Sequence, residues 1–158
     1  MERMLHLALA ACVLAPVAVS AQSTTPDHSM VSAAELKWVD LPSLPPGAQA
    51  TVLEGPMDKA MPFTARLRLP ANYRIPPHTH PAIEHVSVLS GTLYMGLGEK
   101  LDTSKGMPVR RGDFAVMQPG APHFAYTTSE PVELQLHGVG PWGITYLNPA
   151  DDPRKKLP

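Results

Sequence analysis

Cysteine is nearly absent from this sequence. The only thiol, Cys12, lies in an apolar N-terminal segment, so the domain that follows has neither a disulfide nor a catalytic thiol. An excess of charge of one sign is also lacking, because 13 Lys and Arg face 14 Asp and Glu, and only 17% of residues are charged. This balance argues against a basic nucleic-acid surface, and we interpret the pair Lys155 and Lys156 as a solvated chain end.

No apolar run is long enough to cross a bilayer. The longest, residues 5–19, is shorter than the roughly 20 residues that a membrane-spanning helix needs. It follows the basic Arg3 and ends in the small residues at positions 19–21, which is the pattern of a secretory signal peptide. We therefore predict a signal peptide over residues 1–21 with cleavage after Ala21, and a periplasmic or secreted protein with no stable membrane span. The alternative is a lipoprotein anchored at Cys12, because residues 9–12 have the form of a lipobox.

Proline is abundant, at 19 of 158 residues. This frequency disfavours long helices and favours short strands joined by turns. Alternation of apolar and polar residues is clearest at 63–69, where four apolar side chains share one face. We expect further strands at residues 50–53, 73–75, 84–89, 92–97, 107–109, 114–117, 123–127, 132–137 and 144–147. The pattern predicts one all-β domain, a sandwich or barrel.

The expected domain organisation follows from these patterns. Residues 22–44 form a leader, in which residues 36–41 can provide an edge strand or a clasp on a partner subunit. Residues 45–148 form the barrel, and residues 149–158 form a polar tail. Within the barrel, we expect 84–89 and 92–97 to pair as a hairpin around the turn at Gly91.

Chemistry-bearing residues are concentrated between His78 and Gly91. If this run is one extended strand, His78, His80 and Glu84 leave the same face, with the two histidines roughly 6–7 Å apart. Imidazole and carboxylate together suit Zn, Mn, Fe, Ni or Cu. A fourth ligand should come from elsewhere.

Three other histidines are candidates for that fourth ligand. His123 follows a turn that would deliver it at the start of a strand. His85 has the opposite parity to Glu84, so it should point outward from the barrel. His137 shares a face with Gln135; an interior face would allow substrate contact, and an ordinary buried histidine is the alternative.

The spacing of these residues resembles the two motifs of the cupin superfamily. The first motif, Gly-x5-His-x-His-x3-Glu-x6-Gly, is matched by His78, His80, Glu84 and Gly91, with Asn72 at the leading glycine. The second motif, Gly-x5-Pro-x-Gly-x2-His-x3-Asn, is matched by Gly112, Gly120 and His123, with Gln118 and Thr127 at the proline and asparagine positions. The likeness covers roughly residues 45–148. A weaker likeness connects the chain to the cupin half of zinc-binding anti-sigma factors.

The resemblance implies a small cupin β-barrel, the double-stranded β-helix or jelly roll. It also implies that His78, His80, Glu84 and His123 hold one divalent metal ion (Fe, Mn, Zn or Ni) and that no organic cofactor is needed. Small cupins usually form homodimers, and we expect Trp38 and the proline-rich segment after it to form the contact.

Two functions are compatible with such a site. The first is a metal-dependent enzyme acting on a small organic molecule bound at the ion, with Glu84 as a catalytic proton acceptor. A dioxygenase is the leading reaction type, and an isomerase or lyase remains open. The second is a non-catalytic cupin of the cell envelope that binds or senses a metal or small ligand.

Overall fold

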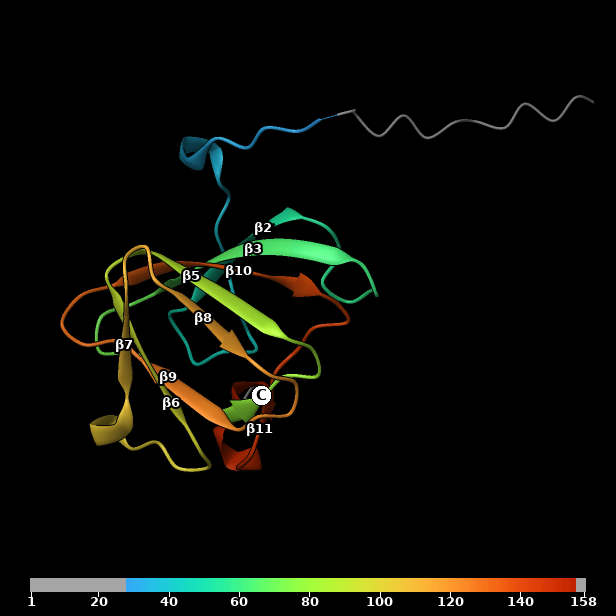
Figure 1. Ribbon diagram of the computed structural model, residues 1–158. Coiled ribbons are helices and arrows are strands. Elements are labelled where there is room, and N and C mark those ends of the chain that lie inside the picture. Colours follow the sequence, from blue (N-terminus) through green and yellow to red (C-terminus); the bar gives the residue numbers. More distant parts are fainter. Residues whose placement is uncertain (1–27, 156–158) are drawn as a thin grey trace, which may run out of the picture. The chain divides into compact units, whose positions relative to one another are not determined.

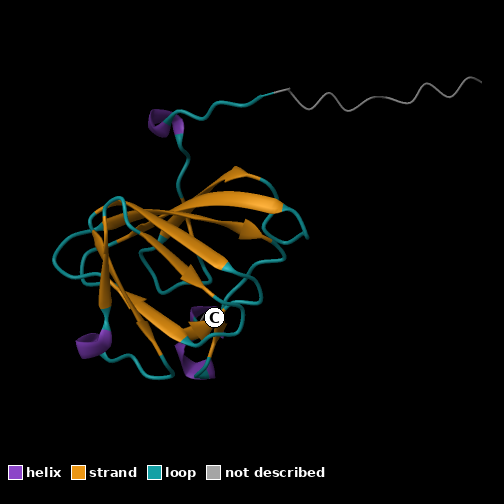
Figure 2. Ribbon diagram, in the orientation of Figure 1, coloured by secondary structure: helices purple, strands orange, loops and turns teal. Residues whose placement is uncertain are grey.

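The computed structural model describes residues 28–155, and the chain divides after Met30 into two units. The second unit holds every strand of the described chain (Figure 1). Residues 28–155 contain no α-helix. Their only helical turns are four 3-10 turns of three residues each: η1 (Ala33–Glu35), η2 (Thr103–Lys105), η3 (Pro149–Asp151) and η4 (Pro153–Lys155), drawn purple in Figure 2. No helix in this part of the chain has the length and hydrophobicity to cross a membrane.

The strands form two antiparallel sheets, which confirms the all-β prediction (Figure 1). The six-stranded sheet has, in spatial order, β1 (Val39–Asp40), β2 (Gln49–Glu54), β3 (Pro62–Leu69), β10 (Val132–Val139), β5 (Glu84–Ser90) and β8 (Phe114–Met117). The five-stranded sheet has β11 (Thr145–Tyr146), β4 (Arg74–Thr79), β9 (His123–Tyr126), β6 (Thr92–Leu97) and β7 (Met107–Arg110). The predicted export segment 1–21, with Cys12, lies outside the described residues.

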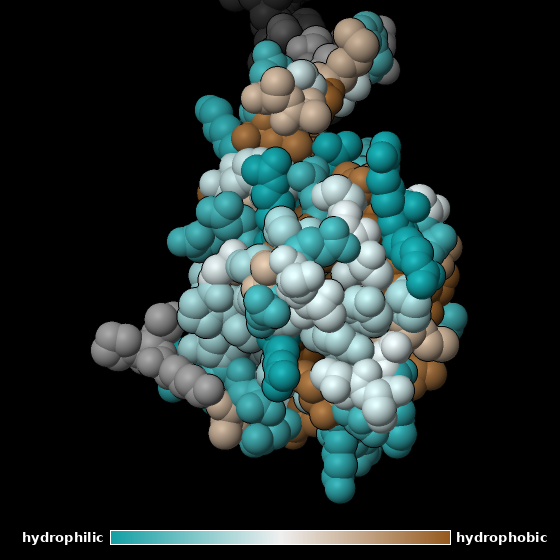
Figure 3. Space-filling view, turned by 90° about the vertical axis from the view of Figure 1, so that its left-hand side faces the viewer, coloured by the Kyte–Doolittle hydropathy of each residue, from teal (hydrophilic) through white to brown (hydrophobic). Residues whose placement is uncertain are grey.

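The core lies between the two sheets and follows the period-2 pattern of the sequence. In β3, Phe63, Ala65 and Leu69 are each 1% exposed, while the alternate residues face outward. β10 pairs with β3 along its whole length and contributes Leu134 and Leu136 to the same interior. The surface in Figure 3 is mostly hydrophilic or neutral, in agreement with this inward placement of apolar side chains.

The expected hairpin between 84–89 and 92–97 is wrong. β5 pairs with β10 and β8, whereas β6 pairs with β9 and β7 in the other sheet. The chain crosses between the sheets at Gly91, whose φ of 73° lies in the left-handed region. A Cβ at this position would lie 2.4 Å from the carbonyl oxygen of Pro131, so the crossing requires glycine.

β4 is longer than expected because it continues through Pro76 and Pro77 to Thr79. Proline lacks the N–H that a ladder needs, so a central strand should end there. The pairing of β4 with β9 shifts register between Ile75 and His78, however, and the two prolines fall inside this irregularity. The strand therefore continues past the two prolines and includes His78.

The departures from the family motifs at Asn72 and Thr127 have structural explanations. Asn72 has φ 57°, the left-handed conformation that glycine favours and that asparagine tolerates better than most residues. Thr127 is buried; its hydroxyl accepts from the Tyr73 N–H at 2.9 Å and donates to the Pro70 carbonyl at 2.6 Å. Both residues secure the entry into β4, which presents the first histidine.

Candidate metal centre

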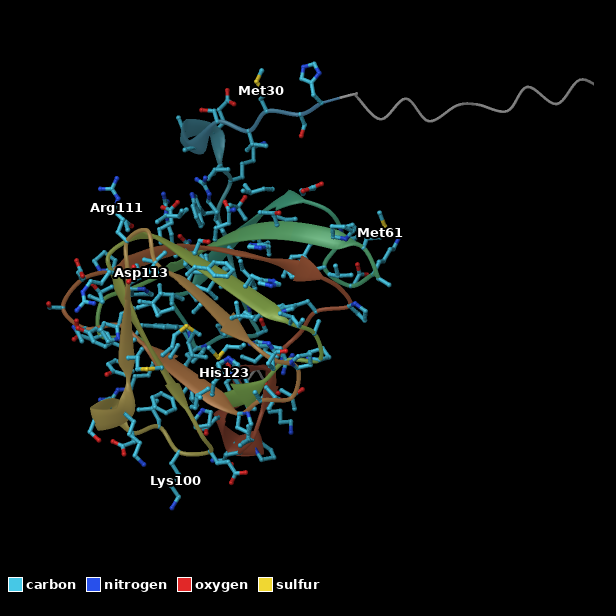
Figure 4. All side chains as sticks on the ribbon, viewed as in Figure 1. Met30, Met61, Lys100, Arg111, Asp113 and His123 are labelled. Carbon is cyan, nitrogen blue, oxygen red and sulfur yellow. The ribbon has the colours of Figure 1, made fainter. Side chains whose placement is uncertain are left out.

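Three histidines meet at one end of the five-stranded sheet. His78 lies near the end of β4, His80 lies just past it, and His123 (labelled in Figure 4) is the first residue of β9. His78 and His123 are direct cross-strand partners, with ring centroids 4.2 Å apart. One ligand atom from each of the three residues lies within 4.8 Å of the others, and the three side chains are at most 3% exposed. This is the spacing that a shared metal ion requires.

The backbone favours the same tautomer of the neutral ring in all three histidines. In each, Nδ1 lies within hydrogen-bond distance of a carbonyl oxygen, which can only accept a proton. The pairs are His78 with Pro76 at 2.7 Å, His80 with Gly143 at 2.6 Å, and His123 with Ala121 at 2.9 Å. Nδ1 therefore carries the hydrogen in the neutral ring, and Nε2 keeps its lone pair. Metal-ligating histidines are oriented by the same kind of supporting bond.

Glu84 reaches the histidines from the opposite sheet, as the first residue of β5. Its Oε1 lies 3.4 Å from His80 Nε2, and its Oε2 lies 3.4 Å from His123 Nε2. Both Nε2 atoms and Oε2 are buried without a hydrogen-bond partner. Lone pairs that face one another across a buried gap are unfavourable, and a cation between them would satisfy all of them. The residues present thus fit a metal ion.

Burial and mutual proximity alter the acidity of these groups. Burial, reinforced by the neighbouring His123 and His80, lowers the pKa of His78 to about 3. Burial also lowers the pKa of His80, against the opposing pull of Glu84. Burial alone would raise the pKa of the Glu84 carboxyl, but the contact with His123 and the charges of the histidines hold it below its ordinary value. The site therefore favours neutral His78 and His80 beside a carboxylate, which is a ligand set ready for a cation.

His123 differs from the other two histidines. Burial would lower its pKa, but the contact with Glu84 and the bond to the Ala121 carbonyl outweigh burial and raise the pKa above its ordinary value. In the metal-free site, His123 therefore binds a proton more readily than the other two histidines. A metal ion has to displace that proton.

The premise that one strand supplies three of these groups is wrong. β4 ends at Thr79 and β5 begins at Glu84, and these two strands belong to different sheets. His80 and Glu84 converge because the chain crosses from one sheet to the other between them. The motif spacing thus encodes a crossing between sheets.

The remaining sequence candidates lie outside the barrel. His85 and His137 are cross-strand partners on the outer face of the six-stranded sheet, with rings stacked 4.8 Å apart at 9°. The outward prediction for His85 is confirmed. Gln135 and His137 alternate with the interior residues Leu134 and Leu136, so they do not face the interior.

Sequence reasoning missed the residues that border the site. Trp142 stacks on His80, with ring centroids 4.5 Å apart at 20°. No periodicity in the segment from Gly138 to Gly143 points to the site. Leu41 and Leu44 line the same small cavity as His78, His80 and Glu84.

Comparison with known proteins agrees with this architecture. The family model of ChrR cupin-like domains matches residues 26–142. No curated protein matches the sequence.

Several solved structures share the fold. The polyketide cyclase RemF from Streptomyces resistomycificus is 19% identical, with a TM-score of 0.65 over 83% of this chain and 94% of its own. KdgF from Halomonas sp. is 18% identical, with a TM-score of 0.55 over 71% of this chain and 95% of its own. The DMSP lyase DddQ from Ruegeria pomeroyi DSS-3 is 19% identical, with a TM-score of 0.59 over 73% of this chain and 63% of its own. Identities this low establish a common fold only, the cupin jelly roll. With the family match covering most of the sequence, the chain belongs to the ChrR cupin-like domains of the cupin superfamily.

Proposed function

We propose that this protein is a metal-dependent enzyme that acts on a small organic molecule. In this proposal, Nε2 of His78, His80 and His123 and the carboxylate of Glu84 hold one divalent ion. The carrying observation is that all three Nδ1 atoms face backbone carbonyls, which leaves the Nε2 lone pairs free. The three buried histidines have ligand atoms within 4.8 Å of one another, and Glu84 contacts two of them. Fe, Mn, Zn and Ni all accept this set of donors.

The charge of the site defines the kind of molecule it would accept. Three neutral imidazoles and one carboxylate leave a divalent ion with a net positive charge, which attracts an anionic or enolate-like oxygen. A divalent ion at this position supplies Lewis acidity towards such an oxygen. Glu84 is the chain's own candidate for proton transfer, because its buried carboxylate contacts His80 and His123 and would be able to accept a proton if it leaves the ion.

Oxygenase chemistry is the leading reaction type, with isomerase or lyase chemistry as the alternative. Among proteins of the same fold, RemF is a polyketide cyclase and DddQ is a DMSP lyase, so the fold accommodates more than one reaction. The proposal includes export, with cleavage after Ala21, and assembly as a homodimer. Export is supported by the signal-peptide pattern, and the homodimer is supported by the usual assembly of small cupins.

Elemental analysis of the purified protein tests the ligand assignment. We expect about one equivalent of a transition metal in the wild type and much less in His80→Ala. Losing a hydrogen bond that supports a ligand typically lowers metal affinity roughly 10- to 100-fold, and losing the ligand itself should lower it further. His85→Ala is the matched control, since its ring lies on the outer face close to Glu84 in sequence. Stoichiometric metal in His80→Ala would show that the assignment is wrong.

A second candidate function is metal or small-ligand sensing without catalysis. One observation favours it: the cavity beside His80 and Glu84 measures only about 40 Å³, which leaves little room for an organic substrate. Metal identity separates the two functions. Iron or manganese with measurable oxygen uptake supports an oxygenase, whereas tightly held zinc with no turnover of any substrate supports a sensor.

A further inference from the structure

Trp142 is fixed to the candidate metal centre from two directions. Its indole stacks on the ring of His80, and the next carbonyl along the chain, that of Gly143, accepts the Nδ1 hydrogen of the same ring. Its own backbone N–H donates to the Met57 carbonyl at 2.7 Å. The indole therefore has a defined place beside one ligand of the site.

The indole Nε1 is buried and has no hydrogen-bond partner among the described residues. An indole N–H can only donate, and buried donors in folded proteins nearly always find an acceptor. Trp142 lines a cavity of about 40 Å³ together with His78, His80 and Glu84. An acceptor atom placed in this cavity would therefore lie beside His80, Glu84 and the indole that carries this unpartnered donor.

The second cavity that touches the site offers no such donor. It also measures about 40 Å³ and lies inside the barrel, where His78, Glu84 and His123 meet apolar side chains such as Leu93, Met95 and Leu136. Both cavities have mostly apolar linings, and only the one beside Trp142 includes an indole. A volume of about 40 Å³ admits only a few atoms, since one water molecule needs at least about 10–15 Å³ of the same kind of space.

We propose that Trp142 is a specificity-determining residue whose Nε1–H donates to an anionic oxygen of the ligand bound at the centre. The ligand class is a small carboxylate or enolate, with its charged oxygen in the cavity beside His80. This inference rests on the proposed function, because it needs a cation held by the three histidines and Glu84. The indole N–H and the positive site then select together for a hard, accepting oxygen over a soft anion.

Nuclear magnetic resonance of the zinc-loaded wild type tests this contact with no substitution in the site. The chain has two tryptophans, so Trp38→Phe assigns the two indole N–H signals. Adding acetate should shift the Trp142 indole proton downfield, as a new bond to a charged acceptor forms, and leave the Trp38 signal in place. A Trp142 signal that does not move while acetate binds overturns the proposal.

Anion affinity provides the second test. In the cobalt-loaded protein, visible absorption should report binding of acetate and of methanethiolate, whose sulfur is a poor acceptor. Trp142→Phe keeps an aromatic ring against His80 but lacks the N–H, so acetate should bind about tenfold more weakly or worse, with methanethiolate nearly unchanged. Unchanged acetate binding, or equal weakening of both anions, overturns the proposal. Failure of the wild type to bind zinc or cobalt would instead refute the proposed function, so the two failures are distinguishable.

Discussion

Acid should destabilise the metal-free protein, with His78 as one of the groups responsible. This ring is 3% exposed, and its pKa in the folded protein is about 3, against 6.5 for an ordinary histidine. At a pH between these two values, His78 is protonated in the unfolded chain and neutral in the folded chain. The free energy of unfolding therefore falls as the pH drops from 6.5 towards 3.

The size of this effect follows from the shift in pKa. One pKa unit corresponds to about 1.36 kcal/mol, so a shift of about 3.5 units removes about 5 kcal/mol by pH 3. A typical domain has only about 5–15 kcal/mol in total. The lowered pKa values of His80 and Glu84 act in the same direction, since both groups resist protonation in the folded state. His123 has a raised pKa and acts oppositely: its stabilisation is complete below pH 6.5 and is lost at higher pH.

Urea denaturation of metal-stripped protein across pH 3–7, followed by tryptophan fluorescence, measures this effect. His78→Gln removes the buried titrating group. Between pH 7 and pH 3, the free energy of unfolding of this variant should therefore fall by about 5 kcal/mol less than that of the wild type. His28→Gln, at an exposed position outside the strands, is the control and should behave as the wild type does. Parallel stability curves for His78→Gln and the wild type would refute the reasoning.

Further predictions concern the backbone, the packing and the ion. Asn72→Ala should cost about 1–2 kcal/mol because φ is 57° there, while Asn72→Gly should cost little, as thermal unfolding can measure. Gly96→Ala should cost about 1–3 kcal/mol in chemical denaturation, because its Cβ would lie 2.1 Å from the buried ring of Phe124; undiminished stability would mean that the ring moves freely. Zinc at 100 times its dissociation constant should raise the free energy of unfolding by about 2.7 kcal/mol in the wild type and far less in His80→Ala. Metal binding should weaken as the pH falls below the raised pKa of His123, and calorimetry in buffers of different ionisation enthalpy should detect release of that proton.

The period-2 pattern was sufficient to predict most strands, because alternation reports directly which face of a strand is buried. β3 illustrates this, since its apolar residues from Phe63 to Leu69 fill the core as expected. The pairing of the strands was harder to predict from the sequence. Nothing local distinguishes a hairpin at Gly91 from a crossing between sheets, because both need a residue with positive φ and both join two strands of similar composition.

The residues of the candidate site were predicted from the sequence, but one of the two arguments for them was wrong. His78, His80, Glu84 and His123 do lie together, yet the parity argument assumed one strand where the chain crosses between two sheets. The family spacing identified the cluster because it encodes that crossing. Trp142 could not be predicted, since its place beside His80 depends on how a loop distant in sequence packs in three dimensions.

The carbonyl partners of the three histidines also imply an order of assembly. His78 and His123 are each held by a carbonyl two residues earlier in the chain, so these rings acquire their orientation as soon as their own strands form. His80 is held by Gly143, 63 residues later. We therefore expect the His78 and His123 rings to be oriented locally during folding. The His80 ring can be oriented only after the segment around Gly143 has packed against it. We expect metal loading to be a late event, and truncation before residue 143 to leave a centre with two oriented rings and one free to turn.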